Sequence, residues 1–333
     1  MTKFTRRTML KMGALAPVAA TASPLALRSA FAADSNWPER TVTIVLPYGP
    51  AGAAGIVSQA MAANMSGSLG QSVIVVNRPG GNTVIGATAL LEEPADGYTM
   101  FWGSANQLTN PLTMKDLTIN YETDFVPVSQ IARFPSIIAV REDFPAQNFG
   151  EFLDYIRANP GKVTCGTHST VSVPHLAMEQ LQKLADIKMV HVPYKGASVA
   201  VQELMGGQVD SVIVTTSTIS PALEAGKARL LAATGSQRAS IFPDIPTVAE
   251  SGFPGFNFDD WAGMFYKTGV PQEIVTKASQ AIAKACADPE IAGPQAKVGT
   301  QLLGTSPEDF TAFLNEQRTT IVQLVKELGL VPG

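Results

Sequence analysis

The feature that most constrains this chain is a repeated order of short β-branched segments, glycine-rich loops and helical segments. Thr41–Leu46 predicts a strand that ends in a loop rich in glycine and alanine, and Ile56–Leu69 then has the apolar spacing of a helix. The same order recurs at Ser72–Val76, where another glycine-rich loop leads into a predicted helix at Val84–Glu93. Such alternation is typical of a mostly parallel sheet with helices on both faces.

The alternation resumes in the middle of the chain and ends in a helical C-terminal region. Two such series predict two lobes joined by crossovers near residues 133–136 and 250–260, with lobe 1 at 37–133 plus 255–333 and lobe 2 at 134–254. Ser136–Val140 lies between the series and is assigned to the crossover. The remaining predicted strands are Tyr98–Trp102, Lys162–Cys165, Met189–Val192 and Val209–Val214, and the chain then returns through Trp261–Tyr266. The remaining helices are Pro174–Leu184, Ala197–Met205, Gln272–Ala287 and Pro307–Leu328.

Residues 1–32 form a predicted export signal of twin-arginine type. Arg6 and Arg7 precede an apolar stretch, and Ala30-Phe31-Ala32 has the small-x-small pattern of a cleavage site. The apolar stretch is broken by prolines and is too short for a membrane span of about 20 residues. We therefore expect cleavage near Ala32 and a periplasmic protein.

The charge of the expected mature chain limits its partners. Removing residues 1–32 removes five basic residues and no acid, so 19 Lys and Arg remain against 28 Asp and Glu, a formal charge of −9. This balance argues against nucleic acid or an anionic membrane surface as partner. Cys165 and Cys286 are the only cysteines, and two buried free thiols are slightly favoured over a disulfide.

Three loops that follow predicted strands could bind an anion. In Pro47–Gly55 the glycines let the backbone approach a ligand, and the helix that follows presents unpaired N–H groups. In Asn77–Ala87, Arg78 could clamp a carboxylate, although structural pairing of Arg78 is the favoured alternative. Gly166–His175 holds four hydroxyl side chains, more than N-capping requires, with His168 facing the cleft and His175 packed structurally.

Catalytic and cofactor motifs are missing from the sequence. The first loop reads G-x-x-G-x-x-G instead of the dinucleotide spacing, and no Gly-Lys-Ser/Thr follows it. No nucleophile elbow occurs, and the three histidines lack metal-ligand spacing. A hydrolytic site could still assemble from Ser104 or Ser169 with His168 and Asp210, but nothing in the sequence favours it. We expect no enzyme activity, cofactor or metal.

Many short motifs, in order and spacing, resemble the Bug-type substrate-binding proteins of tripartite tricarboxylate transporters. The resemblance covers almost the whole expected mature chain. The matching segments are Trp37–Arg40, Asn77–Gly80, Ile85–Ala87, Pro94–Thr99, Asp124–Val128, Asn159–Lys162, His175–Ala177, His191–Gly196, Gly207–Asp210, Pro243–Glu250 and Gly252–Pro254.

The resemblance implies a periplasmic-binding-protein-like clamshell that closes on a small mono-, di- or tricarboxylate, aliphatic or aromatic, and delivers it to membrane permease subunits. A monomer is expected. The alternatives are an extracytoplasmic ligand receptor for a sensor kinase and, less favoured, a carboxylate- or ester-processing enzyme. The expected ligand-binding residues are Tyr48, Gly49, Ala51, Gly52, Ala53, Ile85, Gly86, Ser104, Asn106, Thr167, His168, Ser169, Thr170, Ser172 and Asp210.

The first loop departs from the pattern of the family it resembles. That pattern is Pro-Gly-Gly-x-x-Asp, and Gly55 stands at the Asp position. The missing side chain and charge predict a roomier site that tolerates bulkier or more anionic ligands. Four aromatic residues near the expected cleft would suit a flat ring between carboxylates: Tyr48, Trp102, Phe134 and Trp261. Packing in the core or at the hinge is the equally favoured alternative for most of them.

Overall fold

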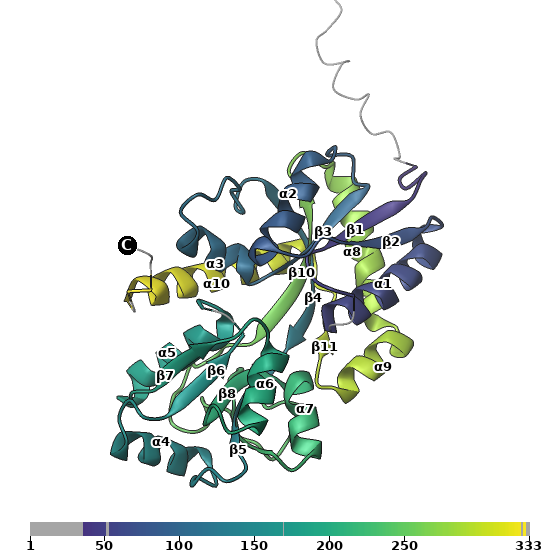
Figure 1. Ribbon diagram of the computed structural model, residues 1–333. Coiled ribbons are helices and arrows are strands. Elements are labelled where there is room, and N and C mark those ends of the chain that lie inside the picture. Colours follow the sequence, from purple (N-terminus) through teal and green to yellow (C-terminus); the bar gives the residue numbers. More distant parts are fainter. Residues whose placement is uncertain (1–35, 51–52, 169, 328, 331–333) are drawn as a thin grey trace, which may run out of the picture. The chain divides into compact units, whose positions relative to one another are not determined.

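The strands of this protein form two sheets. The computed structural model describes residues 36–50, 53–168, 170–327 and 329–330, so the expected signal at 1–32 lies outside the described residues. The first sheet has the order β11-β4-β10-β3-β1-β2 and the second β7-β6-β8-β5-β9 (Figure 1). The strands are β1 (Val42–Leu46), β2 (Val73–Asn77), β3 (Thr99–Ser104), β4 (Phe125–Phe134), β5 (Ser136–Arg141), β6 (Thr164–Thr167), β7 (Val190–Pro193), β8 (Ser211–Thr215), β9 (Ala228–Ala233), β10 (Asp260–Lys267) and β11 (Gln301–Leu302).

The α/β architecture is as predicted, but both sheets are mixed and not mostly parallel. β1 is parallel to β2 and β3, and β6 is parallel to β7 and β8. Every antiparallel pair contains β4, β5 or β10. These three strands carry the chain between the sheets, so they run against the strands of the strand–helix–strand units. Ser136–Val140, expected to lie between the two series, is thus part of β5 in the second sheet.

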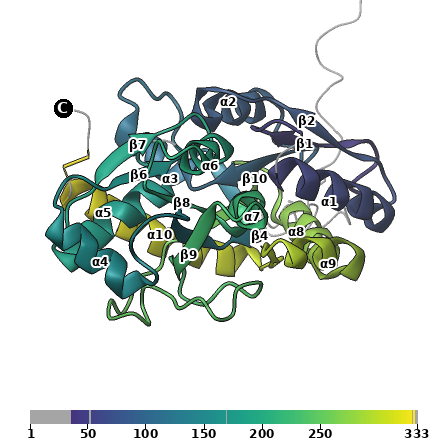
Figure 2. The same cartoon turned by 60° about the horizontal axis from the view of Figure 1, so that its bottom comes forward.

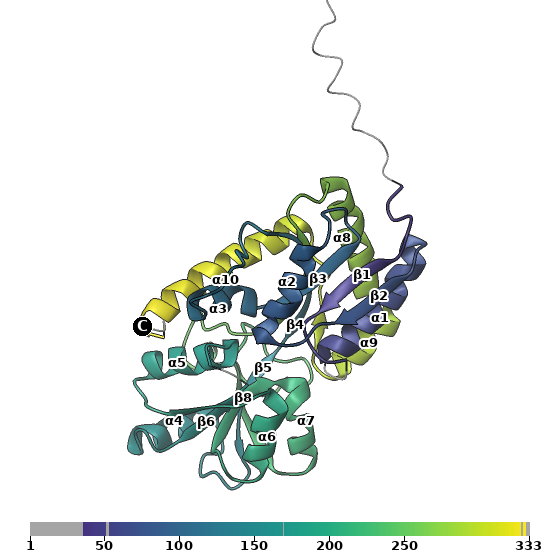
Figure 3. The ribbon, with the colours of Figure 1, turned by 45° about the horizontal axis from the view of Figure 1, so that its top comes forward.

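Alternating side chains of the first sheet divide its core into two layers. Val42, Ile44 and Leu46 are buried in one cluster with α1 and α8, whereas Val45 and Phe101 belong to the cluster that includes α2 and α10. Figure 3 shows α1 and α2 on opposite sides of these strands. A strand buried on both faces reads as a continuous apolar run, which is why β1 was recognisable from sequence.

The second sheet is covered in the same way. Ile137 and Ala139 pack with α6 and α7, while Ile138 and Val140 face the cluster that contains α4 and α5. Figure 2 shows these four helices grouped around β6, β8 and β9. The crossovers leave the first sheet at Phe134 and return to it at Asp260. The expected lobe boundaries near these points stay a prediction.

The helices agree with the sequence where amphipathic spacing was clear. Gln272–Ala287 and Ala197–Met205 have the predicted bounds, but α3, α4, α7 and α9 were not predicted. Within the described ranges, no helix is long and apolar enough to span a membrane. The helices are α1 (Ala53–Leu69), η1 (Gly81–Thr83), α2 (Val84–Glu92), α3 (Asn106–Thr113), α4 (Phe149–Ala158), α5 (Val173–Ala185), α6 (Ala197–Met205), α7 (Thr216–Glu224), α8 (Gln272–Ala287), α9 (Pro289–Lys297) and α10 (Pro307–Glu327).

The two cysteines are free and buried, as the sequence favoured. Cys165 lies in β6 and Cys286 in α8. Burial raises the pKa of each thiol to about 12, so both stay protonated at neutral pH.

Candidate functional site

A cavity of about 420 Å³ lies where strand ends of both sheets meet. The first sheet contributes the segment after β1, the ends of β3 and β4 and the start of β10, and the second contributes the segments after β6 and β8. Carboxyl ends of strands are the usual position of ligand sites in α/β proteins. The lining residues are Tyr48, Gly49, Pro50, Ala53, Ala54, Trp102, Ser104, Asn106, Phe134, His168, Thr215, Ser217, Thr218, Asp260, Trp261 and Ala262.

On the first side, neutral polar groups form a connected network. The Tyr48 hydroxyl and Ser104 Oγ are 2.8 Å apart, and Ser104 Oγ donates to Asn106 Oδ1 at 3.4 Å. Asn106 Nδ2 in turn donates to Asn82 Oδ1 at 2.6 Å. The segment after β1 is held in place by Asn77 Nδ2, which donates to the Tyr48 carbonyl at 2.7 Å. These contacts orient hydroxyl and amide groups at the cavity without a charged side chain.

The Tyr48 phenol remains a hydrogen-bond donor at physiological pH. Burial raises the pKa of Tyr48 to about 12, although the hydrogen bond to Ser104 acts in the opposite direction. The negative charge of Asp260 raises the Tyr48 pKa further. The phenol has one hydrogen, so it donates either to Ser104 or to a ligand oxygen. When it donates to a ligand, the Ser104 hydrogen turns from Asn106 to the Tyr48 oxygen and keeps the ring in place.

On the second side, the cavity meets the N-terminus of α7. Thr215 precedes the helix, and its Oγ1 lies 2.8 Å from Thr218 Oγ1 and 3.2 Å from Ser217 Oγ. The Thr215 side chain makes no capping hydrogen bond to the helix backbone. The start of a helix carries a partial positive charge and N–H groups without partners inside the helix. The Thr216 N–H donates to the Pro135 carbonyl at 2.9 Å, so an anion beside the three hydroxyls would meet the next N–H groups of α7.

One carboxylate, Asp260, also lines the cavity. Among the described lining residues there is no Lys or Arg, and His168 is the one basic side chain. Burial raises the pKa of Asp260, and the His168 imidazole acts to lower it. The cavity therefore combines neutral donors with a single acid and lacks the arginine clamp by which many proteins hold a carboxylate.

The structure places six of the expected binding residues at this cavity: Tyr48, Gly49, Ala53, Ser104, Asn106 and His168. Three others, Ala51, Gly52 and Ser169, lie outside the described residues. Among the described residues that line the cavity, the other six expected residues do not occur: Ile85, Gly86, Thr167, Thr170, Ser172 and Asp210.

The residues that do not line the cavity have other surroundings. Thr167 Oγ1 is 2.8 Å from His191 Nε2, and Ser172 caps α5 by accepting from the His175 N–H. Asp210 accepts from the Thr164 N–H at 2.9 Å and pairs with Arg141 Nε at 3.3 Å. Each of these side chains thus has a partner within the protein, and its expected contact with a ligand stays a prediction.

Ile85, Gly86 and Thr170 also lie apart from the cavity. Ile85 is 51% exposed, Thr170 is exposed, and Gly86 packs beneath Pro47 and Phe101. Arg78, the alternative carboxylate clamp, is exposed and does not line the cavity either.

His175 is a packed structural residue, as expected. Its ring stacks on His191 with 3.7 Å between the centroids, and its Nδ1 accepts the Val171 N–H at 2.9 Å. Burial and the neighbouring His175 lower the pKa of His191 to about 4. The two rings thus contact the loop between Thr167 and Ser172, His191 through Thr167 and His175 through the Val171 N–H.

Sequence reasoning missed the groups that β8 and β10 bring to the cavity. Asp260 and the hydroxyls of Thr215, Ser217 and Thr218 were not among the expected residues. The hydroxyls had a recognisable signal, because four consecutive Ser or Thr residues follow a predicted strand. The four expected aromatic residues all line the cavity: Tyr48, Trp102, Phe134 and Trp261.

The expectation of extra room beside Gly55 is wrong. A Cβ atom added to Gly55 would overlap the carbonyl oxygen of Pro50, and its distance to the Pro50 Cα would be 2.8 Å. The backbone before α1 therefore occupies the space that a side chain at position 55 would need. Gly55 brings the loop close to the first turn of the helix and does not enlarge the cavity.

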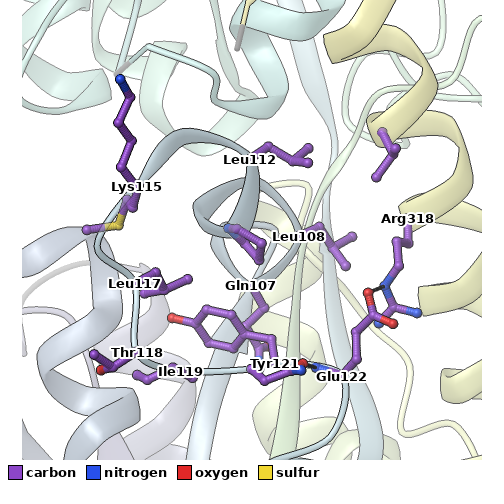
Figure 4. Close-up of a pocket in the computed structure, with 14 residues that line it drawn as sticks. Gln107, Leu108, Leu112, Lys115, Leu117, Thr118, Ile119, Tyr121, Glu122 and Arg318 are labelled. Carbon is purple, nitrogen blue, oxygen red and sulfur yellow. Dashed lines mark hydrogen bonds and ion pairs between the residues drawn. The ribbon is translucent and has the colours of Figure 1, made fainter. Parts of the chain in front are cut away.

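A larger cavity of about 580 Å³ lies between α3, the following loop and α10 (Figure 4). Glu122 reaches across to Arg318, with 3.1 Å between Oε1 and Nε, and the Tyr121 hydroxyl accepts from Asn110. Its described lining comes from neither sheet, so no strand ends converge there.

The described residues also hold no group of three or more His, Cys, Asp or Glu that could bind a metal.

Comparison with known proteins gives a uniform result. Residues 57–330 match the model of the tripartite tricarboxylate transporter family receptor. A UPF0065 protein in the gbd 5′ region of Cupriavidus necator is 32% identical, with 92% of this chain and 93% of the relative covered. Bordetella pertussis protein BugT is 27% identical, with 88% of this chain and 91% of BugT covered.

Solved structures agree. The periplasmic binding protein BugD is 29% identical with a TM-score of 0.75, covering 88% of this chain and 99% of that one. An R. palustris protein with adipate is 30% identical with a TM-score of 0.79, covering 88% and 98%. MatC from Rhodopseudomonas palustris with bound malate is 27% identical with a TM-score of 0.74, covering 87% and 100%.

Proposed function

Because the chain belongs to the tripartite tricarboxylate transporter receptor family, the Bug/TctC solute-binding proteins, we propose that it captures a small carboxylate in the periplasm and delivers it to membrane permease subunits. The family is one of receptors and not of enzymes, so no catalytic step is assigned to the cavity. An export signal at residues 1–32 and a monomeric state are parts of this proposal.

The observation that carries the carboxylate assignment is the lining of the 420 Å³ cavity. Neutral donors from the first sheet, Tyr48 and Asn106 among them, stand opposite the uncapped start of α7. Backbone N–H groups and hydroxyls can bind an anion without a basic side chain. The adipate and malate named with two similar structures are carboxylates of a size that such a cavity holds.

The proposed mechanism follows from the two origins of the lining. A ligand that contacts Tyr48 from one sheet and Thr218 from the other bridges the two parts of the protein. Closure around the ligand excludes water, which strengthens the hydrogen bonds to the carboxylate, and the permease distinguishes the closed form from the open form.

A thermal-shift screen tests the carboxylate assignment. The mature protein is heated with aliphatic and aromatic carboxylates, and with sugars and nucleotides as controls. A carboxylate at 100 times its Kd is expected to stabilise the native state by about 2.7 kcal/mol, which raises Tm by roughly 4 °C in a chain of about 300 residues. A shift with a control compound, and none with any carboxylate, would contradict the proposal.

A second test uses Gly55. In Gly55→Ala the added methyl group collides with Pro50, so Tyr48, Gly49 and Pro50 must move at the cavity. We expect the affinity for the carboxylate found in the screen to fall at least about tenfold, or about 1.4 kcal/mol, as measured by calorimetry.

Gly67→Ala is the matched control, because Gly67 lies in the same helix and a Cβ there meets open space. It should bind normally and gain about 0.5–1 kcal/mol in stability. Equal affinities of the two variants would show that the position of the Pro50 segment does not matter for binding.

A further inference from the structure

Asp260 is an acid at a site proposed to bind an anion, and His168, the basic side chain whose charge acts on it, forms no ion pair with it. None of the hydrogen bonds or ion pairs found among the described residues reaches its carboxylate. Its neighbour in sequence, Asp259, is by contrast paired with the Ser136 N–H and Arg133. The Asp260 carboxylate is therefore available to a ligand.

The sheet register places Asp260 beside an aromatic ring and the neutral network. In the antiparallel pair of β10 and β4, Asp260 lies opposite Phe134, so their side chains are neighbours on one face. Two residues further along β10, Ala262 is on the same face and pairs with Ser104 of β3. The charge of Asp260 also acts on the Tyr48 phenol. The acid is thus a neighbour of Phe134 and lines the same cavity as Tyr48 and Ser104.

The energetic situation of Asp260 favours a positive ligand group. Burial raises its pKa because the ionised form loses hydration without gaining a hydrogen bond. A second carboxylate placed next to it would increase this cost. A cationic nitrogen would remove it, and the rings of Tyr48 and Phe134 offer cation–π contacts to the same group.

On the basis of the proposed function, we infer that the ligand is a zwitterion. Its carboxylate lies at the start of α7 beside the hydroxyl groups, and its positively charged nitrogen lies at Asp260. Asp260 then determines specificity by selecting amino-bearing carboxylates over plain ones. Asp260 favours amino-bearing ligands in two ways, because it attracts their cation and repels a second carboxylate.

The test compares pairs of ligands that differ in an amino group. Calorimetry at pH 7.5 measures butyrate against 4-aminobutyrate, succinate against aspartate, and 4-methylbenzoate against 4-(aminomethyl)benzoate. We expect the wild-type protein to bind the amino-bearing member of at least one pair at least tenfold more tightly. Asp260→Asn should reduce that preference at least tenfold and should strengthen binding of the plain carboxylate.

Asp259→Asn is the matched control, because it removes a carboxylate one residue away that does not line the cavity. It should leave the preference between paired ligands unchanged. If plain carboxylates bind and no amino-bearing partner is preferred, or if Asp260→Asn keeps the preference, the zwitterion inference is wrong while the proposed function stands. If no carboxylate of either kind binds to any variant, the proposed function fails and the inference fails with it.

Discussion

Phe310→Ala is expected to lower the free energy of unfolding by about 3–5 kcal/mol, the usual cost of removing a buried phenylalanine ring. Phe310 is completely buried at the start of α10. Its ring packs against Phe265 at 5.1 Å and against Trp261 at 5.7 Å between centroids. Both partners belong to β10, so the ring fixes α10 to the centre of the first sheet. Urea unfolding of wild type and variant measures the difference.

The absence of a side chain at Gly263 gives the Phe310 ring its space, and a substitution there is a control for the Phe310→Ala prediction. A Cβ atom at Gly263 would overlap Phe310 Cζ, so the glycine forms the hollow that receives the ring. Gly263→Ala alone should cost about 1–3 kcal/mol through overpacking. In the double variant the methyl group partly fills the cavity left by the ring, so the two costs should sum to more than the observed loss. Strict additivity would mean that Gly263 and Phe310 do not share this space.

The predictable part of the fold consists of segments whose own residue pattern indicates a strand or a helix. β1 and β2 are short apolar runs between turn signals, and α8 has clear amphipathic spacing, so their sequences sufficed. β4 was missed because Pro127 and Gln130 interrupt its pattern. The antiparallel pairs could not be derived either, because they depend on how the crossover strands enter each sheet, which local periodicity does not encode.

The residues of the candidate site also differ in how far the sequence alone could predict them. Tyr48 and His168 follow predicted strands directly, so the rule that ligands lie at carboxyl strand ends identified them. Asp260 stands at the beginning of β10, and only pairing with β3 and β4 brings it to the cavity. Asp210 attracted attention as an acid beside a strand, yet it stands at the amino end of β8 and pairs with Arg141. Both acids stand at the amino ends of their strands, and strand direction separates them. β10 runs antiparallel to β3, so its amino end lies at the carboxyl end of β3, whereas β8 runs parallel to β6.

Asp259 is expected to make the stability of this protein fall as pH rises from about 4 to about 6. Its carboxylate, 9% exposed, accepts the Ser136 N–H at 3.2 Å and has Arg133 Nε at 3.9 Å, so it connects the two crossovers. Burial raises the pKa of Asp259 to about 6, more than Ser136 and Arg133 lower it, and the charge of Asp260 acts in the same direction as burial. The ordinary pKa of an unfolded aspartate is about 3.9.

Because the folded pKa is the higher one, the native state holds more protons than the unfolded state between these values. The stability that protonated Asp259 contributes is fully present below pH ~4. It is lost as pH rises through ~6, and the free energy of unfolding then falls by up to about 3 kcal/mol. Asp259→Asn keeps an oxygen acceptor for Ser136 and carries no charge. Urea unfolding at pH 4 and pH 7.5 should therefore show the variant gaining about 2–3 kcal/mol relative to wild type at the higher pH.

Asp154→Asn, at a position 78% exposed in α4, controls for loss of one surface charge and should change stability little at either pH. A wild-type-like pH profile in Asp259→Asn would mean that the buried carboxylate between the crossovers is ionised at no cost, which its nearly complete burial opposes.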